Sequence, residues 1–233
     1  MTDILIIRGW GSRRENWQKF ISILEERDYR IFSPDLPGFG STPSPCDPWA
    51  IDDYVDWVKD FCENNNLSQF FLLGHSFGGG VAIKYILKYP ESVKKLILAD
   101  VSIIRKKTKS KEGLKKTASF LKKLSFLPFY NQFRKLSYKL IFRKSDYPFV
   151  QGVMKDTYLK IINEDLSGLL EKVKIPTLIV WGEKDESTPI QDAFLIKEKI
   201  TGSELKTLPK ICHNPHLEAP EKLAEIILKF LNK

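Results

Sequence analysis

Ser76 lies between two glycines, each two residues away, in the segment Gly-His-Ser-Phe-Gly at 74–78. An apolar run at 69–73 precedes this segment, and apolar residues with helical spacing follow it from 81 to 89. A strand that turns directly into a helix in this way holds a serine in a strained backbone conformation that exposes its hydroxyl. The amino end of the helix also favours negative charge that develops beside the serine. The segment therefore predicts that Ser76 is a nucleophile.

A serine hydroxyl is a weak nucleophile unless a neighbouring base accepts its proton. The chain has three histidines, His75, His213 and His216. His75 is next to Ser76, and we expect its side chain to point away from the serine as a buried structural residue. His213 and His216 follow the last expected strand, where a loop can bring an imidazole onto the serine. The residues alone leave both of them open as the base.

A carboxylate is expected to orient that imidazole and to stabilise its protonated form. Asp185 follows the apolar run 176–181, at the carboxyl end of an expected strand, where ligands gather in parallel sheets. Asp100 ends the preceding expected strand and is the main alternative, ahead of Glu183. Asp35 is expected to shape its own turn.

Acyl transfer also needs hydrogen-bond donors for the oxygen that becomes negatively charged. The backbone amide of Phe77, directly after the serine, is one candidate. The loop after the first expected strand supplies the second candidate, the backbone amide of Trp10. Both donors belong to the backbone, so the type of side chain says little about them.

Short apolar runs alternate with amphipathic helical patterns along most of the chain. This alternation predicts an α/β protein whose mostly parallel, doubly wound sheet is covered by helices on both faces. Residues 1–100 and 173–233 are expected to form this core, and 101–172, which lacks strand patterns, an all-helical insertion. The strands are expected at 3–7, 29–33, 69–73, 95–100, 176–181 and 204–208, the core helices at 17–24, 51–61, 81–89 and 223–231, and the helices of the insertion near 114–124, 133–140 and 150–161.

The net charge of +8 is concentrated in the expected insertion. Residues 101–172 hold 17 Lys and Arg against 6 Asp and Glu, whereas the remainder holds 20 basic and 23 acidic residues. Such asymmetry concerns partners and surface rather than fold. It does not by itself indicate nucleic-acid binding, because no recognisable nucleic-acid module accompanies it.

The composition places the chain among ordinary globular proteins, with 42% hydrophobic and 28% charged residues in 233. No apolar run is long enough for a transmembrane helix, and the amino-terminal residues lack the features of a signal peptide, so we expect a cytoplasmic protein. Three unrelated cysteines and no clustered Cys/His pattern predict neither disulfides nor a metal site. No cofactor is expected.

Five segments in the same chain order resemble the α/β-hydrolase superfamily over nearly the whole chain. In that family the last segment begins with the catalytic histidine, so the resemblance implies His213 as the base, Ser76 as the nucleophile and Asp185 as the acid. It also implies that 101–172 is the family's lid. The segments are Gly9-Trp10-Gly11, Asp35-Leu36-Pro37-Gly38-Phe39-Gly40, Gly74-His75-Ser76-Phe77-Gly78-Gly79, Trp181-Gly182-Glu183-Lys184-Asp185 and His213-Asn214-Pro215-His216-Leu217-Glu218-Ala219-Pro220.

Two departures from the family pattern affect these expectations. The chain starts at the family's third strand, so the usual amino-terminal hairpin is expected to be missing. The His-Gly that normally precedes the oxyanion loop is Arg8-Gly9 here. Arg8 is therefore a candidate to bind a substrate carboxylate.

The resemblance implies a serine hydrolase that cleaves a carboxylic ester or thioester through an acyl-enzyme, with a small-molecule ester as substrate. One alternative is a carrier-protein or lipid acyl-ester hydrolase, in which the basic lid attracts an acidic carrier protein or an anionic lipid surface. Another is a non-hydrolytic member of the fold that binds a small molecule. Substrate identity, acyl length and oligomeric state do not follow from the sequence.

Overall fold

The computed structural model describes residues 2–105 and 151–233. Six strands form one sheet in the order β2-β1-β3-β4-β5-β6, and every neighbouring pair is parallel. The predicted α/β-hydrolase fold is therefore confirmed, with no antiparallel hairpin among the described strands. The strands are β1 (Thr2–Ile7), β2 (Tyr29–Phe32), β3 (Phe70–His75), β4 (Val93–Ala99), β5 (Thr177–Gly182) and β6 (Glu204–Leu208).

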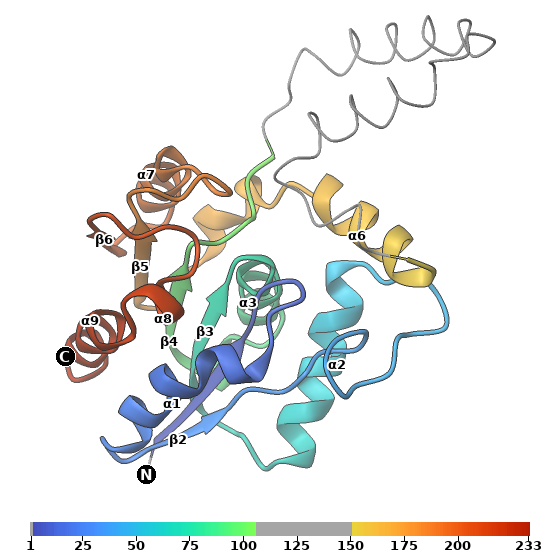
Figure 1. Ribbon diagram of the computed structural model, residues 1–233, viewed down its shortest axis with the longest axis horizontal. Helices are drawn as coiled ribbons and strands as arrows, with labels where there is room; N and C mark the ends of the chain where they lie inside the picture. The colour runs from blue at the N-terminus through green and yellow to red at the C-terminus, as the bar shows by residue number, and fades with distance from the viewer. Residues whose placement is uncertain (1, 106–150) are drawn as a thin grey trace, which may run out of the picture.

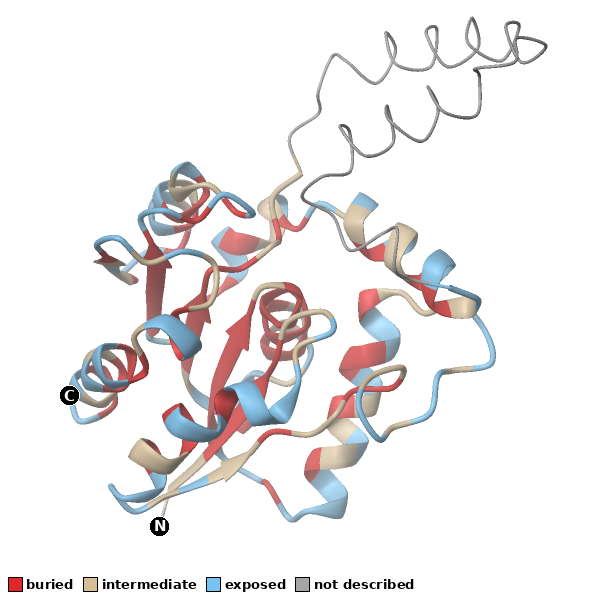
Figure 2. Ribbon diagram, in the orientation of Figure 1, coloured by how far each residue is buried: buried red, intermediate tan, exposed pale blue. Residues whose placement is uncertain are grey.

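The central strands are mostly apolar because helices cover both faces of the sheet. Every residue of β3 and of β5 is buried, whereas the edge strands β2 and β6 are mostly intermediate (Figure 2). A continuous apolar run, rather than an alternating one, is the pattern that such strands show.

Helices cover both faces of the sheet (Figure 1). α1 (Gln18–Glu25) and α9 (Pro220–Leu231) bury their apolar residues against one face, and α2 (Ile51–Asn64), α3 (Phe77–Lys88) and α7 (Ile190–Lys199) against the other.

The sequence analysis predicted all of these helices except α7. This helix buries only two apolar residues, Ala193 and Ile196, so its apolar stripe is too narrow to give a clear helical pattern.

The strand order changes direction between β1 and β3. From β1 the chain passes to β2 on one side, and it then returns to β3 on the other side of β1. The loops that follow β1 and β3 consequently diverge at the carboxyl ends of these strands, which is where open parallel sheets bind their ligands. The fold thus places the loop with Trp10 beside the turn with Ser76.

One of the three helices expected in the insertion lies among the described residues, as α6 (Val153–Asn163). It packs onto the core through Thr157, which is fully buried and whose Oγ1 accepts a hydrogen bond from the Trp49 amide at 3.0 Å. A short 3-10 helix, Ser167–Lys172, leads from α6 to β5. The helices expected near 114–124 and 133–140 lie outside the described residues, so the division into core and lid stays a prediction.

Candidate active site

Ser76 occupies the turn between β3 and α3 with a backbone φ of 51° and ψ of −119°. A non-glycine residue rarely adopts a positive φ, so this turn is strained, as predicted. The flanking glycines make the strained turn possible, because a Cβ on Gly78 would lie 2.0 Å from the carbonyl oxygen of Ile7 and one on Gly74 would lie 2.7 Å from that of Gly78.

His213 lies between the serine and a buried carboxylate. Its Nε2 is 3.0 Å from Ser76 Oγ, and its Nδ1 is 2.7 Å from Asp185 Oδ2. The tautomer that satisfies both contacts has the proton on Nδ1, which donates to Asp185, so Nε2 accepts from the Ser76 hydroxyl. The structure therefore brings together the serine, the histidine and the first-choice aspartate of the sequence analysis.

Asp185 is held as a carboxylate by its hydrogen-bond donors. Its Oδ1 accepts from the amides of Ser187 at 2.7 Å and Thr188 at 2.9 Å, and Oδ2 accepts from the Thr188 hydroxyl and from His213. Burial by itself would raise the pKa of Asp185, but the hydrogen bonds from His213 and Thr188 outweigh it and lower that pKa below its usual value. A fixed negative charge next to Nδ1 is what an imidazole needs to accept a proton at Nε2.

Asp100, the alternative acid, is a neighbour of this group but differs in charge. One carboxylate oxygen from each of Asp100 and Asp185 and one ring nitrogen of His213 lie within 4.8 Å of one another. Asp100 has no exposed surface, its Oδ1 accepts from the Gly182 amide at 2.8 Å, and its Oδ2 has no hydrogen-bond partner among the described residues. Burial, helped by the nearby charge of Asp185, raises the pKa of Asp100 to about 9. Asp100 is therefore neutral near pH 7, which favours Asp185 as the acid.

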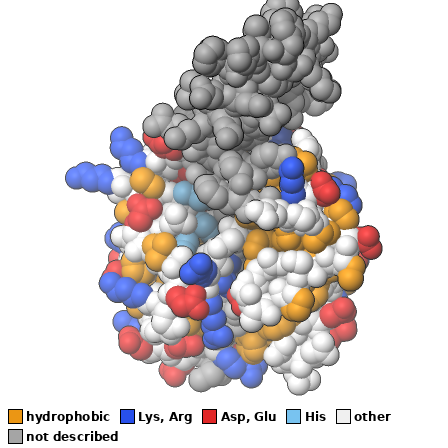
Figure 3. Space-filling view, turned by 45° about the vertical axis from the view of Figure 1, so that its right-hand side comes forward, with side chains coloured by type: hydrophobic (Ala, Val, Ile, Leu, Met, Phe, Trp, Pro, Cys, Tyr) orange, Lys and Arg blue, Asp and Glu red, His pale blue; other side chains and the backbone are white. Residues whose placement is uncertain are grey.

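The two remaining histidines are buried and do not contact the serine hydroxyl. His75 donates a hydrogen bond from Nε2 to the carbonyl oxygen of His213 at 2.8 Å, and burial lowers the pKa of His75 to about 3. His216 stacks on Trp17 with 3.8 Å between ring centroids, and burial lowers its pKa to about 2. Both are neutral structural residues. The His213 side chain keeps 21% of its surface exposed, and histidine is visible at the surface in Figure 3.

The two predicted oxyanion donors line the same cleft as Ser76. Trp10 and Phe77 both contribute to its wall, and their rings pack edge to face with 5.7 Å between centroids. Within the described part of the chain, neither backbone amide has a hydrogen-bond acceptor. Amides without a partner beside a nucleophile are available to a developing oxyanion.

Arg8 occupies a different place from the one expected of a substrate-binding residue. Only 4% of it is exposed, and its guanidinium donates to the carbonyl oxygens of Ser12 at 2.8 Å and Pro34 at 2.9 Å. It also forms an ion pair with Asp35, which receives hydrogen bonds from Ser41 as well. Arg8 joins the loops after β1 and β2 and does not line the cleft. Its expected role in binding a substrate carboxylate is therefore not supported.

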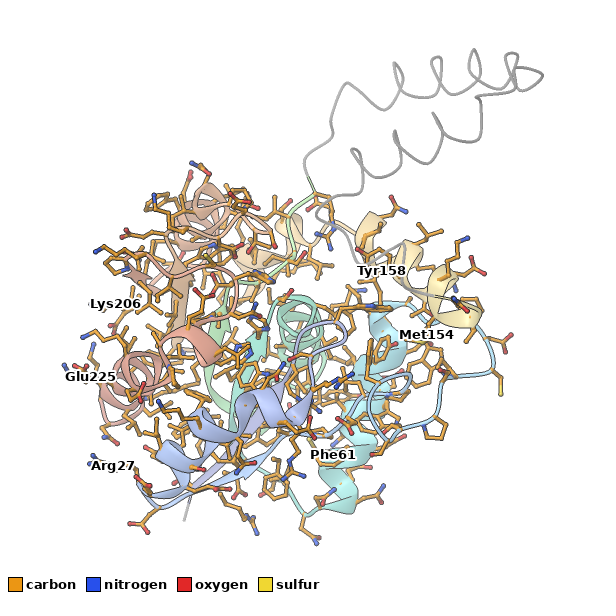
Figure 4. All side chains as sticks on the ribbon, viewed as in Figure 1. Arg27, Phe61, Met154, Tyr158, Lys206 and Glu225 are labelled. Carbon is orange, nitrogen blue, oxygen red and sulfur yellow. The ribbon has the colours of Figure 1, made fainter. Side chains whose placement is uncertain are left out.

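The cleft has a volume of about 510 Å³ and is partly closed by α6. Tyr158, labelled in Figure 4, lies on α6 and packs against Trp10 with 5.0 Å between ring centroids. Arg105, at the end of the segment after β4, is a further lining residue. Neither residue was predicted from the sequence, because Tyr158 lies within a helical pattern and Arg105 is one of many basic residues in 101–172. The lining residues are Gly9, Trp10, Gly11, Ser12, Asn16, His75, Ser76, Phe77, Ser102, Arg105, Tyr158, Ile161, Ile162, Ser187, Thr188, His213, Asn214 and Leu217.

Comparisons with known proteins agree with the fold. The family described as "alpha/beta hydrolase fold" matches residues 4–122, about half of the chain, so the chain belongs to this family. Its relatives include the monoacylglycerol lipase ABHD6 of Bos taurus, 26% identical over 98% of this chain and 75% of the relative. Lipase 1 of Psychrobacter immobilis is 26% identical over 95% of this chain and 74% of the relative.

A solved structure, the esterase EaEST from Exiguobacterium antarcticum, superimposes with a TM-score of 0.77 at 22% identity and covers 100% of this chain and 92% of the esterase. This likeness supports the fold. No helix among the described residues is long and apolar enough to cross a membrane.

Proposed function

We propose that this protein is a carboxylic-ester hydrolase that works through an acyl-enzyme on Ser76. The observation that carries the proposal is the continuous hydrogen-bonded series from Ser76 Oγ through His213 to Asp185, at 3.0 Å and 2.7 Å. The relatives are a monoacylglycerol lipase and a bacterial lipase, and both names denote ester hydrolysis.

In the first half-reaction Ser76 Oγ attacks the ester carbonyl while His213 Nε2 accepts the hydroxyl proton. The negative charge that develops on the carbonyl oxygen is stabilised by the backbone amides of Trp10 and Phe77. Asp185 stabilises the imidazolium through its hydrogen bond to Nδ1. The tetrahedral intermediate then expels the alcohol, which takes the proton from His213 and leaves the acyl group as an ester on Ser76.

In the second half-reaction water replaces the alcohol. His213 Nε2 accepts a proton from water, whose oxygen attacks the acyl carbonyl, and the same two amides stabilise the second oxyanion. The bond to Ser76 Oγ then breaks, and the serine recovers its proton from His213. A carboxylic acid leaves, and the enzyme returns to its starting state.

Apolar and aromatic side chains form part of the cleft wall and suit an acyl chain. They are Trp10, Phe77, Ile161, Ile162 and Leu217, the last 49% exposed at the rim. A thioester fits the same chemistry. The alternatives of a carrier-protein or lipid acyl ester, and of a non-hydrolytic ligand-binding protein, stay predictions, because most of 101–172 lies outside the described residues.

Hydrolysis of a small aryl ester by purified protein tests the proposal. We expect Ser76→Ala and His213→Ala each to lower kcat by about 10³-fold or more, because the members of such a group act as a unit. Ser22→Ala, on α1 and outside the residues that line the cleft, is the matched control and should leave kcat unchanged. Retention of full activity by Ser76→Ala would reject the proposal.

A further inference from the structure

Arg105 is the only permanently charged side chain among the described residues that line the cleft, and none of those residues is acidic. It is close to the nucleophile, because it contacts Ser102 and the Ser102 amide donates to the carbonyl oxygen of Ser76 at 3.0 Å. A cation in the cleft wall attracts an anionic group of a ligand that enters the cleft.

The described residues offer the Arg105 guanidinium fewer acceptors than it has N–H donors. Its NH1 donates to Ser102 Oγ at 2.9 Å, and its NH2 donates to the carbonyl oxygens of Ser102 at 3.0 Å and Ile161 at 3.5 Å. Its Nε is buried and has no partner within the described part of the chain. A guanidinium offers five N–H donors, so hydrogen-bonding capacity remains.

The described part of the chain also gives Arg105 no direct counter-ion. Among the described residues no carboxylate forms an ion pair with its guanidinium. Asp165, Asp192 and Glu164 act on this charge without contacting the guanidinium. The Oδ1 of Asp165 accepts from the backbone amides of Arg105 and Ser167, and its Oδ2 accepts from the Ser167 hydroxyl. A partly buried cation that is bonded only to neutral oxygens gains free energy when an anion approaches it.

We propose that Arg105 binds an anionic oxygen group of the substrate, so that the ester cleaved at Ser76 carries a negative charge. Carboxylate and phosphate groups share this chemistry, since both accept hydrogen bonds from the planar guanidinium fork. The inference rests on the proposed ester hydrolysis for the identity of the reacting bond. Arg105, which lines the cleft, thus takes the anion-binding role that the sequence had suggested for Arg8.

Arg105 also contributes to structure, because it connects the segment after β4 to the carboxyl-terminal part of α6. A cation near the last carbonyls of a helix is favourable in any case. If Arg105 were purely structural, its substitution would lower kcat/KM for charged and neutral substrates alike. If it binds an anion, the substitution changes the preference between them. The quantity to measure is therefore kcat/KM for the anionic ester divided by kcat/KM for the neutral ester.

The test compares pairs of related esters, in which one member carries an additional anionic group. One pair is p-nitrophenyl hydrogen glutarate and p-nitrophenyl butyrate, and the other is monobutyrin and its phosphate monoester. We expect wild type to prefer the anionic member of at least one pair, and the pair that responds identifies carboxylate or phosphate. Arg105→Gln should lower the anionic-to-neutral ratio about 10- to 100-fold, as expected for loss of a charged hydrogen bond. Arg105→Lys should restore part of it.

Arg30→Gln is the matched control, because Arg30 pairs with Asp3 outside the cleft lining. Its ratio should equal that of wild type. If wild type cleaves the neutral esters and Arg105→Gln leaves both ratios unchanged, the inference is wrong while the proposed function stands.

If neither pair of esters is hydrolysed, a binding measurement distinguishes the anion site at Arg105 from the proposed ester hydrolysis. Calorimetric titration of the protein with monomethyl glutarate and with glycerol phosphate should then show binding that Arg105→Gln weakens about 10-fold or more. That result would uphold the anion site without ester hydrolysis. If the esters are not hydrolysed and binding does not depend on Arg105, both the proposed ester hydrolysis and the anion site are rejected.

Discussion

At the scale of single residues, two neighbouring aspartates are held in different protonation states. Asp185 receives four hydrogen bonds and stays ionised, whereas Asp100 receives one from the Gly182 amide and is neutral near pH 7. Two carboxyl groups this close do not both ionise readily. The hydrogen bonds to Asp185 favour its ionisation, so the carboxyl group that contacts His213 carries the negative charge.

Loss of the Asp185 charge should greatly reduce turnover. Asp185→Asn removes the acceptor for Nδ1–H of His213, so the imidazole loses both its preferred tautomer and the stabilisation of its protonated form. We expect kcat for a small aryl ester to fall by about 10³- to 10⁴-fold with the fold intact. Steady-state kinetics beside a circular dichroism spectrum measures this. Near-normal turnover in Asp185→Asn would mean that another carboxylate orients His213.

Asp100 should instead affect how the stability of the folded protein depends on pH. Its pKa is raised by burial, so between about pH 4 and pH 9 the folded state binds a proton that the unfolded state has released. Stability therefore falls with rising pH over this window because of Asp100. Asp100→Asn is neutral at every pH, so its Tm relative to that of wild type should increase from pH 5 to pH 9. Thermal unfolding across this range measures the difference, and a constant difference would contradict the assignment.

The sequence indicated much of the site at this scale. The glycine-flanked turn identified Ser76, and chain order with the family resemblance identified His213 and Asp185. The ion pair of Arg8 was not foreseen, because its partner Asp35 is 27 residues away on the neighbouring loop and nothing in the local sequence shows that the two pair. Arg105 was missed because spacing does not reveal which basic residue faces a cleft.

At the scale of elements, α3 packs so closely against β1 that no side chain fits between them. Gly78, at the start of α3, is where the helix meets the carbonyl group of Ile7. This contact fixes the direction of the helix and with it the position of the Phe77 amide.

Gly78→Ala should destabilise the protein, because its Cβ would meet backbone rather than a flexible side chain. We expect a loss of about 1–3 kcal/mol in unfolding free energy, as for other overpacked sites, or failure to fold. Gly168→Ala is the matched control, since nothing lies within 4 Å of the Cβ that it adds. Urea denaturation of both variants measures the effect. Equal stability of the two would show that the approach of α3 to β1 can relax.

The alternation of strands and helices was predictable because each central strand contains a run of at least four apolar residues and each predicted helix has an apolar face. α7 was not predicted, since its buried surface consists of few side chains. The position of α6 at the cleft could not be predicted from the sequence either. It depends on single contacts such as that between Thr157 and the Trp49 amide, which joins residues 108 positions apart.

At the scale of the whole molecule, the proposed reaction needs only protein groups and water. The ligand atoms of Asp100, Asp185 and His213 lie close together, but His213 Nδ1 and Asp185 Oδ2 already share a hydrogen bond, and a neutral Asp100 is a poor metal ligand. The basic excess lies mainly in residues outside the described part of the chain, so its role and the cytoplasmic location stay predictions.

Removal of metal ions should consequently leave activity unchanged. Incubation with a chelator followed by gel filtration into metal-free buffer should give the same kcat and KM for a small aryl ester as untreated protein. A loss of activity that added Zn²⁺, Mg²⁺ or Ca²⁺ restores would contradict the mechanism.

Covalent labelling of Ser76 is the most direct test of the central claim, because it detects the nucleophile itself. A fluorophosphonate probe should add once per protein molecule, and peptide mass spectrometry should place the adduct on Ser76. His213→Ala should react far more slowly and Ser76→Ala not at all, since the serine needs its base to become nucleophilic. An adduct on another residue, or unchanged labelling of Ser76→Ala, would contradict the account.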